Sequence, residues 1–215
     1  YEDNAELWCA ILRAEGTVFS AGADLKEVSA GNGASLATRK GGFAGITRRD
    51  RTKPLIAAIQ GTAVAGGCEI SLSCDLIVAS TETVFGLAEV KRSLAAGAGG
   101  LFRLPRALGM ATAMEVIMTG EPIPAQRAYE LGMVNKVVEP DKVMAEARKL
   151  ADRVLRNAPL AVFASREVAA RAFMDNDEDL WRASGDAMRS LAGTEDYKEG
   201  PLAFIEKRDP VWKGR

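Results

Sequence analysis

The sequence predicts an α/β core followed by a helical C-terminal region. Short apolar runs alternate with helical patterns over roughly the first two-thirds of the chain, which has 215 residues. From Asp141 onward every pattern is helical, with breaks near residues 157–159 and 193–194. Alternating strands and helices are typical of a layered α/β domain, so we expect a core over residues 1–139 and a helical region over residues 140–215.

The expected strands are short, apolar and bounded by turn residues. Pro54 starts one of them, and the pair Gln60-Gly61 ends it. Segments that predict strands are 8–12 (WCAIL), 55–59 (LIAAI), 76–79 (LIVA), 84–86 and 133–138.

The expected helices are marked by their periodicity and by their first and last residues. Pro124 occupies the favoured first position of one helix, and Gly132 ends it. The segment 18–24 predicts a tight loop after a strand, and the weakly patterned segment 25–52 predicts a mobile loop followed by a helix. The other helical segments of the core are 66–74, 97–108 and 111–118.

Charge and cysteine content limit the partners and the compartment. The net charge is −1, which gives no electrostatic reason to expect a nucleic acid or an anionic membrane surface. Charged residues interrupt every apolar run, so we expect no membrane insertion. Three cysteines cannot form a fully paired framework, which favours a reducing cytoplasm.

The 215-residue sequence contains no histidine. Nucleophilic catalysis by a Ser-His or Cys-His pair within the chain is therefore excluded, as is any metal site with histidine ligands. We expect neither a metal nor a separate cofactor. Acid–base chemistry near neutral pH has to come from carboxylates, Lys, Cys, Tyr or water.

Gly66 and Gly67 follow a predicted buried strand and enter a predicted helix. Glycines permit a ligand to approach the backbone, and the first turn of a helix offers unpaired N–H groups that suit an anion. Glu69 lies three residues after Gly66, on roughly the same helix face. The residues alone leave open a purely structural alternative, in which the glycines pack the helix on the sheet and Glu69 complements the helix dipole.

Other short motifs could contribute to a site or could be ordinary structure. The loop of residues 20–24 offers backbone N–H groups but could equally be a turn, and Glu89 could be a surface charge. Residues 97–100 (GAGG) start a helix without the Gly-Lys-Ser/Thr of a phosphate loop. The basic run of Arg48, Arg49, Arg51 and Lys53 predicts a solvated helix end, with contact to a ligand phosphate as the alternative.

In their order along the chain, these motifs resemble those of the crotonase superfamily, the enoyl-CoA hydratase/isomerase family. Each motif alone is weak, but the ordered set is specific. The matching segments are 19–27 (FSAGADLKE), 53–61 (KPLIAAIQG), 66–69 (GGCE), 74–76 (CDL), 85–89 (FGLAE), 97–100 (GAGG), 119–122 (TGEP) and 128–135 (AYELGMVN).

The resemblance implies a spiral of ββα repeats with a helical C-terminal trimerisation region, and an enoyl-CoA hydratase activity on an acyl-CoA substrate. It implies that Glu69 and Glu89 act as the acid–base pair. Backbone N–H groups of Ala23 and Gly66 would form the oxyanion hole. A homotrimer or a hexamer made of two trimers is expected. The residues that would bind coenzyme A, as part of the substrate, are Ala21, Ala23, Asp24, Leu25, Lys26 and Gly66.

The chain also departs from the family pattern. Relatives usually begin with a further strand and helix, and we expect this N-terminal part of the domain to be absent. Ala88 replaces the proline that usually precedes the second glutamate. Leu101-Phe102 replace the usual Thr-Gln after the glycines, and this second change predicts a more apolar acyl pocket. Two alternatives stay open, namely a Δ3,Δ2-enoyl-CoA isomerase that uses Glu89 alone and a non-catalytic CoA-binding scaffold.

Overall fold

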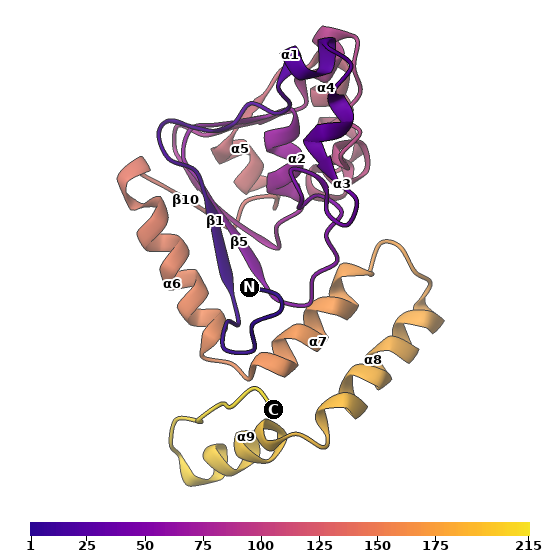
Figure 1. Ribbon diagram of the computed structural model, residues 1–215. Helices are drawn as coiled ribbons and strands as arrows, with labels where there is room; N and C mark the ends of the chain where they lie inside the picture. The colour runs from indigo at the N-terminus through magenta and orange to yellow at the C-terminus, as the bar shows by residue number, and fades with distance from the viewer. The chain divides into compact units, whose positions relative to one another are not determined.

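The structure is a computed structural model that describes residues 1–215, and the chain forms two compact units. The sheet unit comprises Ile11–Asp50 and Leu55–Lys149, and the helical unit comprises Tyr1–Ala10, Arg51–Pro54 and Leu150–Arg215. Figure 1 labels their elements. The division between residues 139 and 140 stays a prediction.

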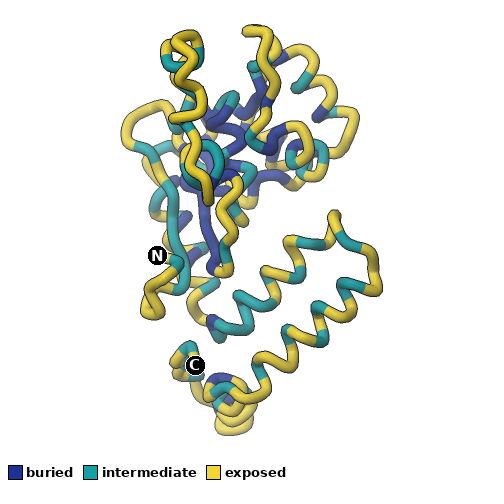
Figure 2. Tube along the Cα trace, turned by 45° about the vertical axis from the view of Figure 1, so that its right-hand side comes forward, coloured by how far each residue is buried: buried dark blue, intermediate teal, exposed yellow.

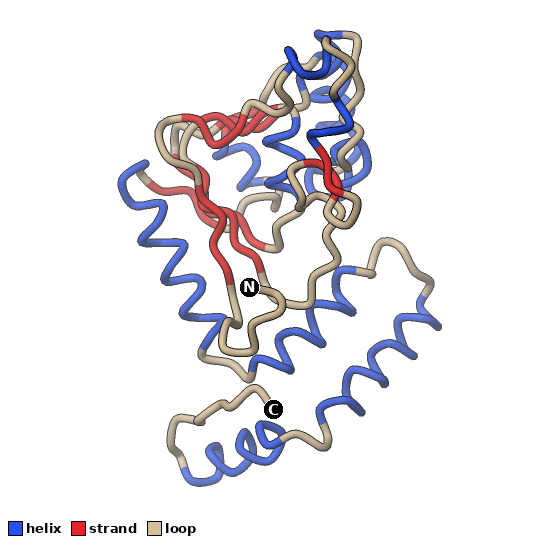
Figure 3. Tube along the Cα trace, in the orientation of Figure 1, coloured by secondary structure: helices blue, strands red, loops and turns tan.

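Two four-stranded sheets form the framework of the sheet unit. The first sheet has the order β1 (Ala10–Arg13), β5 (Leu55–Ile59), β7 (Leu76–Ser80), β10 (Lys136–Val138), and the second has the order β2 (Val18–Ser20), β6 (Thr62–Val64), β8 (Val84–Gly86), β9 (Ile123–Pro124). In the first sheet β5, β7 and β10 pair in parallel. In the second sheet β2, β6 and β8 pair in parallel, and β9 is antiparallel to β8. Figure 3 shows the two groups of strands running in different directions.

Successive strands along the chain enter the two sheets in turn. β5 joins the first sheet, β6 joins the second, and helix α2 (Gly66–Leu72) follows. β7 and β8 repeat this order and lead into the 3₁₀ helix η2 (Ala88–Arg92) and helix α3 (Gly100–Leu108). The predicted α/β class is therefore confirmed. The parallel pairing also brings the loops after β2, β6 and β8 to one edge of the second sheet.

The core of the sheet unit lies between the sheets and the helices α3, α4 (Met110–Thr119) and α5 (Ala125–Glu130). Ile59, Phe85 and Leu104 are at most 1% exposed, and Figure 2 shows the buried strands in dark blue. Complete burial of such a side chain contributes about 1.5–3 kcal/mol relative to exposure. The apolar runs that predict strands form this core.

The segment from Leu25 to Thr52 differs from the prediction. It begins with helix α1 (Leu25–Ser29), continues through the 3₁₀ helix η1 (Gly33–Leu36), and then forms a hairpin of β3 (Ala37–Thr38) and β4 (Gly42–Phe43). The predicted helix before Thr52 is wrong. Gly42 and Gly45 adopt positive φ angles of 67° and 72°, a conformation that interrupts a right-handed helix. Sequence analysis also missed the short strand β6.

The chain after residue 139 is helical. Its elements are η3 (Pro140–Lys142), α6 (Val143–Leu155), α7 (Pro159–Ala170), α8 (Asp177–Leu191) and α9 (Glu195–Glu206), and the helical unit begins within α6, at Leu150. The predicted breaks near residues 157–159 and 193–194 are confirmed, because α7 starts at Pro159 and the Thr194 side chain caps α9 by accepting from the N–H of Tyr197. No helix in the structure has the length and apolar character needed to cross a membrane.

Candidate active site

A cavity of about 880 Å³ opens at the edge of the second sheet in the sheet unit. Its walls come from the loops that follow β2, β6 and β8, together with the hairpin of β3 and β4 and the loop before α3. Clefts beyond the carboxyl ends of parallel strands are common ligand sites, and this volume is sufficient for a small organic ligand.

Two glycines allow the loops after β2 and β6 to touch. Gly22 has a φ of +97°, and a Cβ added to it would lie 2.8 Å from the backbone nitrogen of Gly66. A Cβ on Gly67 would lie 2.1 Å from the carbonyl oxygen of Ser20. A side chain at either position would therefore force the two loops apart.

The backbone N–H groups of Ala23 and Gly66 are available to a ligand. Both residues line the cavity, and neither N–H group donates a hydrogen bond within the chain. Ala65, which precedes Gly66, has φ 50° and ψ −128°, a strained conformation for alanine that sets the orientation of the Gly66 peptide. Two free donors on touching loops can stabilise an oxyanion.

Glu69 lies on α2 at the wall of the cavity and is only 3% exposed. Its Oε1 accepts a hydrogen bond of 2.9 Å from the N–H of Gly100, the first residue of α3. Burial raises the pKa of the Glu69 carboxyl, whereas the backbone N–H groups of Gly100 and Ala98 and the charge of Arg103 oppose this increase. A buried carboxyl with a raised pKa suits proton transfer near neutral pH.

Glu89 lies on η2 at the same cavity and is half-buried. Its Oε2 is buried and has no hydrogen-bond partner. Burial raises the pKa of the Glu89 carboxyl, its own backbone N–H lowers it, and the nearby charge of Glu69 raises it again. An oxygen left without a partner in the protein is available for a water molecule or a substrate.

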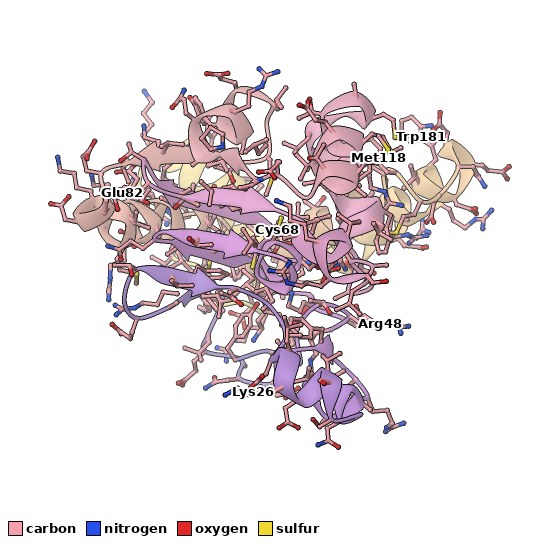
Figure 4. All side chains as sticks on the ribbon, turned by 90° about the horizontal axis from the view of Figure 1, so that it is seen from above. Lys26, Arg48, Cys68, Glu82, Met118 and Trp181 are labelled. Carbon is pink, nitrogen blue, oxygen red and sulfur yellow. The ribbon has the colours of Figure 1, made fainter.

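The structure places the predicted CoA-binding residues in two groups. Ala21, Ala23, Leu25 and Gly66 line the cavity. Asp24 and Lys26 are exposed and are not among its lining residues; the Asp24 side chain instead caps α1 by accepting from the N–H of Lys26 at 2.8 Å. Figure 4 shows Lys26 extending outward from α1.

Several residues of the cavity were not predicted from the sequence, and some of them are far in the chain from the predicted site residues. Phe43 packs so closely on Gly66 that a Cβ on this glycine would lie 2.4 Å from the ring. Arg39, Lys91 and Arg92 also line the cavity. So does Arg48, and Figure 4 shows it near α1. Arg48 is exposed, as predicted, but it lies in a turn and not at a helix end. The predicted solvated position is wrong for Lys53, which is 6% exposed in the helical unit.

Cys68 directly precedes Glu69 in the sequence but is poorly suited to catalysis. It is completely buried. Burial and the charges of Glu69 and Glu89 raise the pKa of its thiol far above the ordinary range, so it stays protonated. No group of three or more metal-type ligands is brought together in the chain.

The chain is similar to known proteins over its full length. The profile of the enoyl-CoA hydratase/isomerase family matches residues 1–215. A carnitinyl-CoA dehydratase of Salmonella heidelberg is 40% identical over 221 residues, covering 100% of this chain and 85% of that protein. An enoyl-CoA hydratase from Mycobacterium tuberculosis H37Rv has a solved structure that is 41% identical in sequence, with a TM-score of 0.94. The match covers 100% of this chain and 84% of the hydratase chain. A carnitinyl-CoA hydratase structure from Mycobacterium avium is 42% identical, with a TM-score of 0.74 and the same coverage.

Proposed function

Because this chain belongs to the enoyl-CoA hydratase/isomerase family, we propose that it is an enoyl-CoA hydratase that adds water across the 2,3 double bond of an enoyl-CoA thioester. One observation carries the proposal: Glu69, Glu89 and the free N–H groups of Ala23 and Gly66 line a single cavity. Hydration of a conjugated thioester needs a base, an acid and a site for negative charge on oxygen, and these four residues supply them.

In the proposed mechanism the thioester carbonyl oxygen binds between the N–H groups of Ala23 and Gly66. Glu69 accepts a proton from water as the water oxygen bonds to Cβ, and the electron pair of the double bond moves toward the carbonyl as an enolate. Glu89 then donates a proton to Cα, which completes the hydroxyacyl product. The two carboxyls exchange protons as a coupled pair, and the roles reverse in dehydration. Loss of one oxyanion donor typically costs about 2.7–4 kcal/mol of barrier.

Coenzyme A would bind as part of the substrate, so the reaction needs no separate cofactor. We assign it to the loop that carries Ala21, Ala23, Asp24, Leu25 and Lys26, with Gly66. The cations Arg39, Arg48 and Arg92 on the cavity wall support this assignment, because a thioester of coenzyme A carries phosphate groups. The exposed Asp24 and Lys26 would contribute to the outer part of this site.

We also propose that the chain assembles as a homotrimer or as a dimer of trimers. Helix α8 contains 15 residues and none of them is buried. Trp181 on α8 is 78% exposed, and Phe204 on α9 is 85% exposed. Large apolar side chains left open to solvent commonly mark protein–protein interfaces. We further propose the cytoplasm as the compartment, and the three free cysteines support a reducing environment.

The experiment that tests the activity uses crotonyl-CoA and a 3-enoyl-CoA thioester as substrates. A hydratase removes the absorbance of the conjugated thioester when crotonyl-CoA is supplied. If crotonyl-CoA is unchanged while the 3-enoyl thioester becomes conjugated, the protein is an isomerase that uses Glu89 alone.

A third outcome would favour the non-catalytic CoA-binding scaffold. Calorimetry with butanoyl-CoA, which has no double bond to hydrate, measures binding without turnover. Binding of butanoyl-CoA together with no reaction of either unsaturated thioester would support the scaffold and contradict both enzymatic functions.

A further inference from the structure

Arg103 on α3 bridges two walls of the cavity. Its Nη2 donates to the carbonyl oxygen of Thr47 at 2.7 Å, and its Nη1 donates to the carbonyl oxygen of Ala98 at 3.3 Å. Thr47 and Ala98 both line the cavity but lie 51 positions apart in the chain, from 47 to 98. The planar guanidinium group can hold two carbonyls in a fixed geometry, which a lysine ammonium group cannot do.

One of these walls holds Glu69. Ala98 precedes Gly99 and Gly100, and the N–H of Gly100 donates to the Glu69 carboxylate at 2.9 Å. Gly99 has a φ of +112°, and a Cβ added to it would lie 2.4 Å from Nη1 of Arg103. The guanidinium group therefore lies directly against the loop that presents the Gly100 donor.

The other wall supports one of the free N–H donors. The carbonyl oxygen of Phe43 accepts hydrogen bonds from the backbone N–H groups of Ile46 and Thr47, at 3.1 and 3.3 Å, so these residues form one turn. The Phe43 ring packs on Gly66, whose N–H is free. By holding Thr47, Arg103 holds the turn that places this ring.

We propose that Arg103 is a positioning residue that joins the Phe43–Thr47 turn to the Ala98–Gly100 loop and thereby fixes Glu69 relative to Gly66. This inference rests on the proposed acid–base function of Glu69. A displacement of about 1 Å in a catalytic arrangement can reduce the rate roughly a hundredfold, so a bridge of this kind has a large effect on turnover.

The chain offers a matched control on the same helix. Arg103 and Arg106 both lie over the ring of Phe102, at 5.4 and 5.2 Å from its centre. Arg106 is exposed and does not line the cavity, and no contact with Thr47 or Ala98 is found for it. Arg103→Met and Arg106→Met thus remove the same kind of cation–π contact, but only the first removes the bridge.

The test measures kcat, KM and the pH profile of kcat/KM with crotonyl-CoA for the wild type, Arg103→Met, Arg103→Lys and Arg106→Met. We expect Arg103→Met to lower kcat about ten- to a hundredfold and to move the acidic limb of the profile to higher pH, because a cation near Glu69 is lost. Arg103→Lys keeps the charge, so its acidic limb stays in place while kcat falls. Arg106→Met behaves as the wild type.

Thermal unfolding of each variant separates a folding defect from a kinetic one. If Arg103→Met does not fold, Arg103→Lys decides the question, and a wild-type kcat for this variant overturns the inference. Equal kcat values and equal pH profiles for Arg103→Met and Arg106→Met also overturn it.

A measurement that is independent of turnover separates this inference from the proposed function. An inactive wild type contradicts the hydratase but not the bridge. In that case, hydrogen exchange of the Gly100 N–H, followed by NMR, measures how firmly the loop presents this donor to Glu69. Faster exchange in both Arg103→Met and Arg103→Lys, without a change in Arg106→Met, supports the bridge, and equal exchange in all of these variants overturns it.

Discussion

The Glu69 carboxylate accepts a hydrogen bond from the N–H of Gly100 at 2.9 Å, although the two residues are 31 positions apart. Glu89, on the same cavity, has a buried oxygen with no partner. The two carboxyls are therefore unequal: the Gly100 N–H holds one in place, whereas the other keeps an oxygen that can still accept a hydrogen bond. This asymmetry supports the assignment of water activation to Glu69 and of proton delivery to Glu89.

Replacement of either glutamate tests the acid–base pair. We expect Glu69→Gln and Glu89→Gln each to lower kcat for crotonyl-CoA hydration about 10²–10⁴-fold, because glutamine keeps the shape but cannot transfer a proton. Binding of butanoyl-CoA, measured by calorimetry, should change little. Full hydratase activity in both variants would contradict the mechanism.

The raised pKa values of both glutamates predict a specific pH dependence of activity. Hydration needs Glu69 ionised and Glu89 protonated, so kcat/KM should follow a bell-shaped profile. The acidic limb should lie above 4.5, the ordinary pKa of a glutamate, because burial raises the pKa of Glu69. Steady-state rates from pH 4 to 10 measure both limbs, and an acidic limb at or below about 4.5 would contradict the expectation.

Stability should depend on pH through the same groups. Glu69 and Glu89 both have a higher pKa in the folded state than an ordinary glutamate. Such a carboxyl makes its full contribution to stability at pH values below the pKa of the unfolded state. This contribution is lost as the pH rises through the pKa of the folded state. At pH 8 the Glu89→Gln variant should therefore resist urea better than the wild type, and the difference should disappear near pH 4. A lower urea midpoint for the variant at pH 8 would oppose this account.

The contact between the two loops predicts that Gly22→Ala is severe. Its Cβ would lie 2.8 Å from the Gly66 nitrogen and would displace an oxyanion donor, so we expect kcat to fall about 10²–10³-fold. Gly16→Ala is the matched control, because Gly16 has a similar φ of +83° and no atom within 4 Å of the added Cβ. Equal activities of the two variants would show that backbone strain alone, and not the contact, determines the effect.

The charges of the cavity predict which acyl groups are accepted. The only carboxylates among its lining residues are Glu69 and Glu89, and the only aromatic residue is Phe43. A quaternary ammonium group is normally held by several aromatic rings, whereas this cavity has one ring, and both of its carboxylates are assigned to catalysis. We therefore expect kcat/KM for an enoyl-CoA with a trimethylammonium group to be at least roughly tenfold below that for crotonyl-CoA. A substrate panel measures this ratio, and a ratio that favours the cationic substrate would contradict the prediction.

The exposed apolar side chains of the helical unit predict its assembly. Trp181→Glu and Phe204→Glu place charges on α8 and α9 and should shift the mass measured by light scattering from trimer or hexamer toward monomer. Glu178→Lys, a change at another position on α8 that is already charged, serves as the control. A monomeric wild type, or an unchanged mass in both Glu variants, would contradict the proposed interface.

The sequence by itself determined the α/β class, the strands built on residues 55–59 and 76–79, and the identity of the chemical groups. These features depend on local properties: the length of an apolar run, the conformations open to glycine, and the absence of histidine. The ordered motifs also indicated the family, because each occupies a short stretch of chain.

Only the tertiary structure decided how those groups are held. Gly100 reaches Glu69, Arg103 reaches Thr47, and the Phe43 ring packs on Gly66 across separations that no local pattern encodes. The hairpin that carries Phe43 was missed because strands of two residues between glycines have no periodicity to detect. The sequence therefore determined which catalytic groups are present, whereas the close packing of distant loops decided their burial, their hydrogen bonds and the direction of their pKa shifts.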